Sequence, residues 1–193
     1  ITSIDVIFPV LHGTFGEDGT IQGLFEIQNC AYVGAGVLGS SVAMDKAVCK
    51  HVMESIGVPV LAYSVFSRRD IQENLQETIA SAEQVAPYPL FTKPANLGSS
   101  VGISKAHNRE ELSEALQLAA RYDRRILVER GIDAREIEIS VLGNTDVQCT
   151  VPGEIVPGDE FYTYKDKYQS GDPEVAIPAP LPDALTSQLQ QYA

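Results

Sequence analysis

The sequence predicts a mixed α/β chain in three parts, for three reasons. Near the start, branched apolar residues lead into a glycine-punctuated loop and then into residues at helical spacing, as in a βαβ unit. In the middle, two strand-like stretches enclose a run of glycine and serine, and later an alternating apolar run predicts more sheet. We expect the end of an N-terminal βαβ domain at residues 1–41, a central lid-bearing domain at 42–134, and the beginning of a C-terminal domain at 135–193.

The first forty residues have the pattern of a strand that delivers a loop. Ile4 to Leu11 predicts a strand, which leads into HGTFGEDG at His12 to Gly19. A helix is expected from there to about Gln28, because acidic residues suit a helix start and apolar residues then recur at helical spacing. Ala31 to Ser40 predicts a short strand and a glycine-rich turn. Open sheets bind ligands at the carboxyl ends of strands, so this loop is a candidate site.

The composition favours a small anionic ligand over a nucleic acid or a membrane. The formal net charge of the 193 residues is -12, whereas a nucleic-acid surface needs a basic face. A local cluster of lysines would still bind an anion, and the candidates are Lys46, Lys93, Lys105 and Lys167. No apolar run has the length of a membrane span, and no series resembles a signal peptide. Since the chain starts without methionine inside an expected strand and stops inside an expected helix, we expect a piece of a larger protein.

The cysteines and histidines do not have the spacing of a zinc site. The cysteines are few, odd in number and widely spaced, which suits reduced, buried thiols in a cytosolic protein; they are Cys30, Cys49 and Cys149. The histidines lack the close Cys/His spacing of such a site.

Asp45 to Ile56 predicts a helix, with Gly57 just beyond its end and Pro59 as a stop. Lys46 lies in the first turn, where a cation is unfavourable for the helix dipole, so a nearby anion would offset the misfit. A solvated surface lysine is the alternative. Ser67 to Glu83 is polar and amphipathic, which predicts a surface helix.

The stretch from Leu90 to Lys105 predicts a hairpin that closes over a phosphate. Lys93 ends an apolar run, and Pro94 stops the strand because it lacks a backbone donor. A run without large side chains follows, in which backbone N–H groups and the hydroxyls of Ser99 and Ser100 can converge on an oxyanion. In a Walker A loop the lysine instead follows the glycines and precedes a helix. An ordinary hairpin with an exposed lysine fits the same pattern.

Beyond the glycines, a strand and a core helix are expected. Val101 and Ile103 restore a period of two, which predicts the second strand of the hairpin. Asn108 and Glu111 form a capping-box pattern ahead of apolar residues that share one helix face.

Two further strands are expected to meet at a hinge. Ile126 to Glu129 predicts a short strand, and Glu136 opens the alternating run EIEISVL. An extended hinge backbone offers N–H and C=O groups to an adenine edge, and a carboxylate just beyond it can accept hydrogen bonds from ribose hydroxyls. A bend with solvated charges is the alternative for Arg135 and Glu138.

The last part combines a strand, a loop and an unfinished helix. Val151 to Tyr168 contains the strand-like GEIVP and then a loop rich in tyrosine and charge, which is typical of a functional loop. Exposed tyrosines in a surface loop are the alternative. Leu185, Leu189 and Tyr192 predict the start of an amphipathic helix.

Five segments together resemble the D-alanine:D-alanine ligase family, ATP-grasp enzymes of peptidoglycan precursor synthesis. In the order of that family, they are HGTFGEDG, MDK at Met44 to Lys46, KPANLGSSVG, ILVERGIDAREIEISVLG and FYTYKDKY. The resemblance extends over essentially the whole chain. It implies an α/β ATP-grasp fold and supports the lid interpretation of the glycine–serine hairpin.

The resemblance also implies roles for individual residues. Lys46 and Lys93 are similar to the lysines on the nucleotide phosphates, and Glu129, with Arg130 to Ile132, to the adenine-binding segment. Glu136 matches the ribose-binding acid. The remaining matches are Ser99 and Ser100 in the lid, where Ser99 orients the loop through a hydrogen-bond triad, Lys167 and Tyr168 in a mobile loop that closes over the substrates, and His12 near the first D-alanine.

The implied reaction joins two molecules of D-alanine through a D-alanyl phosphate, with ATP and Mg²⁺ or Mn²⁺ as cofactors. The family's catalytic glutamate and its metal ligands have no counterpart in these residues, so we expect the 193 residues alone to be inactive and the full-length chain to be active. The resemblance further implies a cytoplasmic enzyme, a homodimer, and no nucleic-acid or membrane partner. The alternatives are a D-alanine:D-lactate ligase, against which Tyr168 argues, and a non-catalytic nucleotide-binding remnant.

Overall fold

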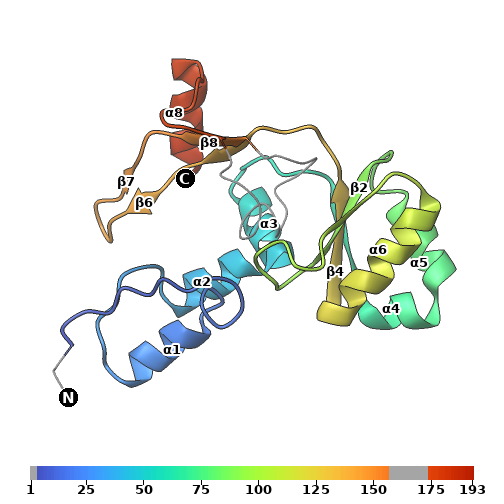
Figure 1. The fold of residues 1–193 in the computed structure, drawn as a ribbon, viewed down its shortest axis with the longest axis horizontal. Helices are drawn as coiled ribbons and strands as arrows, with labels where there is room; N and C mark the ends of the chain where they lie inside the picture. Colours follow the sequence, from blue (N-terminus) through green and yellow to red (C-terminus); the bar gives the residue numbers. More distant parts are fainter. Residues whose placement is uncertain (1–3, 157–173) are drawn as a thin grey trace. The chain divides into compact units, whose positions relative to one another are not determined.

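The computed structural model describes residues 4–156 and 174–193 (Figure 1). The chain divides into two compact units, residues 1–132 and residues 133–193. The expected residues Lys167 and Tyr168 lie outside the described part of the chain.

The first unit is built on a four-stranded antiparallel sheet in the order β1-β4-β2-β3. Its strands are β1 (Tyr63–Ser67), β2 (Leu90–Pro94), β3 (Ser104–Ala106) and β4 (Arg125–Arg130). Strands β2 and β3 form the expected hairpin, but β3 begins only at Ser104. The prediction that Val101 and Ile103 belong to the strand was therefore wrong, because the turn extends through them. Strand β1 was not predicted, since a five-residue segment with two serines has too short a pattern to be distinctive.

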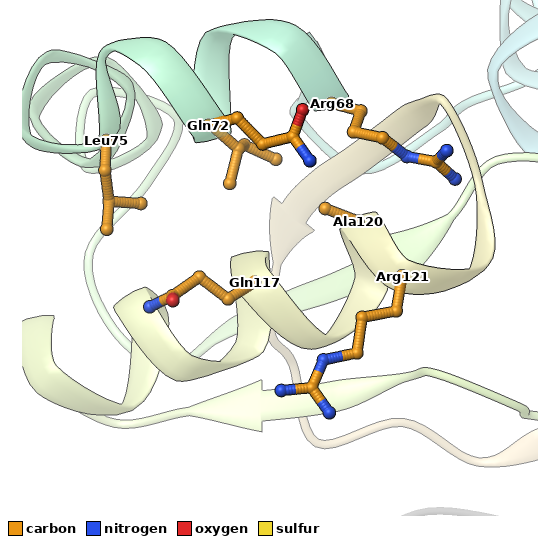
Figure 2. A pocket seen from close by; sticks show the side chains of 7 residues that line it. Arg68, Gln72, Leu75, Gln117, Ala120 and Arg121 are labelled. Carbon is orange, nitrogen blue, oxygen red and sulfur yellow. The ribbon is translucent and has the colours of Figure 1, made fainter.

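Three helices cover one face of this sheet: α4 (Arg68–Glu73), α5 (Leu75–Ala82) and α6 (Arg109–Tyr122). The single helix expected from Ser67 to Glu83 was wrong, because Asn74 leaves the helical conformation (φ −138°) and separates α4 from α5. A cavity of about 550 Å³ lies between α4 and α5 on one side and α6 on the other, with Gln72, Gln117 and Arg121 among its lining side chains (Figure 2).

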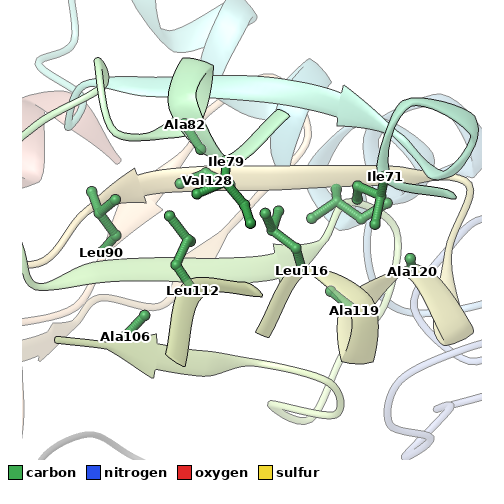
Figure 3. Packing of buried hydrophobic residues seen from close by; sticks show 11 residues of the cluster. Ile71, Ile79, Ala82, Leu90, Ala106, Leu112, Leu116, Ala119, Ala120 and Val128 are labelled. Atoms are coloured by element: carbon green, nitrogen blue, oxygen red, sulfur yellow. The ribbon is translucent and has the colours of Figure 1, made fainter. Parts of the chain in front are cut away.

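The apolar core of the first unit lies between these helices and the sheet (Figure 3). Leu112 and Leu116 of α6 are fully buried against Ile126 and Val128 of β4, so the expected core face of this helix is confirmed. At the start of α6 the Asn108 side chain accepts a hydrogen bond from the Glu111 N–H. The Glu111 carboxylate in turn accepts from the N–H of His107 (2.8 Å), one residue earlier than in the usual capping box.

Helix α3 (Lys46–Ser55) covers the opposite face of the sheet (Figure 1). Ala47 packs there with Ala95 and Leu127. The predicted ends of this helix are confirmed: the Asp45 carboxylate accepts from the Val48 N–H at 3.1 Å, and Gly57 has the positive φ of 81° that favours glycine after a helix. Since strand residues alternate between faces, Glu129 shares the α3 face with Leu127.

The segment before α3 contains α1 (Thr20–Ile27), where a helix was expected, and α2 (Val37–Met44), where it was not. The glycine-rich turn predicted to Ser40 was wrong, and α2 was missed because glycine and serine have low helix propensity. The strand predicted at Ile4 to Leu11 was also wrong. In the described residues it forms one isolated parallel bridge, between Ile7 and Tyr32, because a strand needs a partner along its length.

The second unit contains a three-stranded antiparallel sheet, a two-stranded pair and a helix. The sheet has the order β5-β8-β9, and the pair is β6 with β7. Their bounds are β5 (Glu136–Glu138), β6 (Val141–Leu142), β7 (Gln148–Cys149), β8 (Gly153–Val156), β9 (Glu174–Ala176) and α8 (Asp183–Tyr192). The run EIEISVL thus divides between two sheets, whereas the strand at GEIV and the last helix are confirmed. None of the described helices has the length and apolar character needed to cross a bilayer.

Candidate functional site

The centre of the candidate site is the carboxylate of Glu129, which two lysines bind from different elements. Glu129 lies near the end of β4 and is only 4% exposed. The Nζ of Lys50 on α3 lies 2.8 Å from its Oε2, and the Nζ of Lys93 on β2 binds its Oε1. Burial by itself would raise the pKa of Glu129, but the two ammonium groups outweigh burial and hold this pKa below its usual value. Glu129 is therefore an ionised buried carboxylate.

The register in which β2 pairs with β4 explains how Lys93 reaches Glu129. In the pairing of β2 with β4, Lys93 stands opposite Leu127 and Phe91 stands opposite Glu129. Lys93 and Glu129 are therefore diagonal neighbours on one face of the sheet, within reach of a long side chain.

Lys46, the first residue of α3, lies beside this cluster. Its Nζ donates to the carbonyl oxygens of Pro94 (3.1 Å) and Leu97 (2.5 Å), at the start of the hairpin turn. Burial and the nearby Lys93 ammonium lower the pKa of Lys46 to about 8. The misfit expected from a cation at a helix start is thus offset in this structure by carbonyl oxygens.

The turn of the hairpin packs against the glycine loop near the start of the chain. Ser99 (φ 54°) and Ser100 (φ 57°) are both in the left-handed region. A Cβ added to Gly98 would lie 2.9 Å from the Cα of Gly13, so only glycine permits this close approach. The turn and the loop that begins at the exposed His12 therefore lie side by side.

Glu17 holds that loop in shape. Its carboxylate accepts a hydrogen bond from the Gly13 N–H at 2.5 Å, and the Asp18 carboxylate accepts from the Phe15 N–H at 2.9 Å. Both acidic residues thus close the loop that precedes α1. Asp18 also serves the helix start as expected, since its carboxylate accepts a hydrogen bond from the N–H of Thr20, the first residue of α1, at 3.0 Å.

The other expected site residues lie at the end of the first unit and in the second. The Arg130 N–H donates to the Ala62 carbonyl at 3.0 Å, and Ile132 is 43% exposed. Glu136 is exposed at the start of β5, where it pairs with Ile155 of β8. The structure therefore gathers Lys46, Lys93 and Glu129 in one cluster within the first unit.

Lys50 is a residue of this cluster that the sequence analysis missed. It follows Lys46 by four residues on one helix, and this spacing places two side chains on the same face. That spacing was the available signal.

Metal ligands do not gather in the part of the chain that the structure describes. Within residues 4–156 and 174–193, no three histidine, cysteine, aspartate or glutamate side chains are placed to hold a metal ion. All three cysteines are free thiols, but the expected burial was wrong, because Cys30 is exposed and Cys49 and Cys149 are half-buried.

An antiparallel sheet with a glycine–serine hairpin, and with lysines from a strand and a helix on one face, defines a mixed α/β protein of the ATP-grasp class. Family models give the narrower assignment: the model described as D-ala D-ala ligase C-terminus matches residues 52–193, and that described as D-ala D-ala ligase N-terminus matches residues 1–35. The chain belongs to the D-alanine-D-alanine ligase family.

Individual relatives agree with this assignment. The D-alanine-D-alanine ligase of Chloroherpeton thalassium is 54% identical over 190 residues, which are 98% of this chain and 52% of that protein. The structure of the D-alanine-D-alanine ligase from Coxiella burnetii matches with a TM-score of 0.81 at 36% identity, over 99% of this chain and 49% of that one. The structure of the VanG D-Ala:D-Ser ligase from Enterococcus faecalis matches with a TM-score of 0.83 at 33% identity, over 100% of this chain and 55% of that one. This chain spans about half the length of the curated relatives it matches.

Proposed function

We propose that the complete protein containing these residues is an ATP-dependent D-alanine-D-alanine ligase. The observation that carries the proposal is the cluster of Lys46, Lys93 and Glu129 beneath a glycine–serine turn, in a chain 54% identical to a ligase of that name. A buried patch with more ammonium groups than carboxylates is suited to hold a polyphosphate.

The reaction has two steps, and negative charge must be held in both. The carboxylate of one D-alanine attacks the γ-phosphorus of ATP, and the bond from that phosphorus to the bridging oxygen breaks, so ADP leaves. The amine of a second D-alanine then attacks the acyl carbon, loses a proton, and inorganic phosphate leaves. Lys46 and Lys93 are proposed to hold the phosphates during both steps, since preorganised charges act strongly in a site that excludes water.

Further roles follow from the family. Glu129 and the backbone from Arg130 to Ile132 are proposed to bind adenine, and Glu136 the ribose. His12 is proposed to lie near the first D-alanine. Ser99 and Ser100 are proposed to form part of the lid over the nucleotide. Lys167 and Tyr168 are proposed to belong to the mobile loop that closes over the substrates.

A divalent cation would neutralise phosphate charge when bound. We propose Mg²⁺ or Mn²⁺, held by residues outside those described.

We also propose a division into three parts, a cytoplasmic location and a homodimer. The three parts are residues 1–41, 42–134 and 135–193. Free thiols suit the cytoplasm, and sedimentation of the full protein tests the dimer.

The test is to incubate the complete protein with ATP, Mg²⁺ and D-alanine, with D-lactate or D-serine added in separate reactions. Formation of D-alanyl-D-alanine with one phosphate released per dipeptide supports the proposal. A depsipeptide, or D-alanyl-D-serine as the main product, would assign the protein to a different ligase. ATP binding without any product would indicate a nucleotide-binding remnant.

A further inference from the structure

We propose that Lys50 is a positioning residue, which holds the Glu129 carboxylate in place when Lys93 leaves it to bind the phosphates of the nucleotide. The inference rests on the proposed function of this site. It assigns a division of labour to the two lysines that share one carboxylate.

The first step is geometric. The two oxygens of Glu129 are divided between the two lysines, with Lys50 on Oε2 and Lys93 on Oε1. Lys50 approaches from the β1 side of the site, since its ammonium lies 5.3 Å from the centroid of the Tyr63 ring. Lys93 approaches from β2, the first strand of the hairpin. One lysine can therefore move without displacing the other.

The second step concerns which lysine is fixed. The side chain of Lys50 is 18% exposed and that of Lys93 is 24% exposed. Lys50 is further held by its contact with Tyr63, whose hydroxyl donates to Glu54 Oε2 (3.1 Å), also on α3. Lys93 directly precedes Pro94, whose carbonyl Lys46 binds at the start of the glycine–serine turn. Lys93 is therefore the lysine nearer to the proposed lid.

The third step concerns charge. Lys50 and Lys93 both bind the Glu129 carboxylate, and Lys46 is close enough to interact with it electrostatically. The other two carboxylates near Lys46 have partners of their own: Arg125 binds Asp45, and Asp123 accepts hydrogen bonds from the N–H groups of Asn96 and Arg125. If Lys93 turned to a phosphate in the absence of Lys50, Glu129 would be left buried and unpaired, which is strongly unfavourable. Lys50 removes that penalty, since it keeps one charge-assisted hydrogen bond to Glu129 throughout. Without Lys50, the Glu129 carboxylate would retain Lys93, and Lys93 would not be available to bind the phosphates of the nucleotide.

The test uses the complete protein and the variants Lys50→Met and Lys50→Arg. We expect Lys50→Met to raise KM for ATP and the dissociation constant of a non-hydrolysable ATP analogue by about tenfold or more, as for one lost charge-assisted hydrogen bond. KM for D-alanine at saturating ATP should change by less than about twofold. Lys50→Arg should restore ATP affinity to within about threefold of wild type, because it keeps the charge.

Two controls make the test specific. Arg121→Met removes one exposed cation from α6, on the opposite face of the sheet, and should leave both KM values unchanged. In a Glu129→Gln background, Lys50→Met should alter analogue affinity by less than about twofold, because no carboxylate remains to be held. Thermal unfolding of each variant identifies those that fail to fold.

Wild-type analogue affinity in folded Lys50→Met would overturn the inference. An undiminished effect of Lys50→Met in the Glu129→Gln background would also overturn it. Calorimetric binding of the analogue does not require turnover, so a failure of the ligase proposal, seen as absence of dipeptide from wild type, is distinguishable from a failure of this one.

Discussion

Replacement of Lys93 by alanine is the most direct test of the site. The variant removes one of the two ammonium groups on Glu129 and leaves Lys50 in place at 2.8 Å. A charge-assisted hydrogen bond to phosphate contributes about 1.5 to 3 kcal/mol, and about 1.4 kcal/mol corresponds to a factor of ten, so KM for ATP should rise by about 10- to 150-fold.

The same structure predicts a small effect of Lys93→Ala on folding. Removing the only partner of a buried charge costs about 3 to 5 kcal/mol, but Lys50 still compensates Glu129. The free energy of unfolding should therefore fall by only about 1 kcal/mol.

The assay is phosphate release at saturating D-alanine over a range of ATP concentrations, with urea unfolding of the same preparation. Lys93→Arg is the matched control, since it keeps the charge on the same strand. An unchanged ATP dependence in Lys93→Ala would remove Lys93 from the site. A loss of stability of several kcal/mol would show that Lys50 does not compensate Glu129.

Three further outcomes are expected. The pKa of Lys46 is lowered to about 8, so its ammonium form is lost as pH rises through 8, and kcat/KM for ATP should fall above that pH. Lys46→Arg keeps its charge and should flatten this decrease at alkaline pH. An unchanged decrease in Lys46→Arg would show that another group causes it. Leu116→Ala opens a fully buried site and should lower the free energy of unfolding by about 3 kcal/mol in urea titrations, against about 0.5 kcal/mol or less for the exposed Glu114→Ala on the same helix. Gly98→Ala places a Cβ 2.9 Å from the Gly13 Cα and should reduce kcat/KM for ATP, whereas Gly23→Ala meets nothing within 4 Å and should not.

Several elements were predictable because their signals are local. Asp45 and Gly57 each lie within two residues of the end of α3 that they mark, and Asn108 directly precedes α6. The hairpin was predictable because its turn needs small residues. By contrast, α2 contains glycine and serines whose propensities argue against a helix, and its packing overrides them.

The composition and order of the residues determined by themselves the family, the hairpin with its glycine–serine turn, and the presence of Lys46, Lys93 and Glu129 as candidate ligand-binding groups. Only the tertiary structure decided that Lys50 shares the carboxylate of Glu129 with Lys93, and that Lys46 faces carbonyl oxygens of the hairpin. The physical reason is that caps, turns and periodicity act between near neighbours in the chain. The charge state of a buried carboxylate depends instead on which helix covers which face of the sheet.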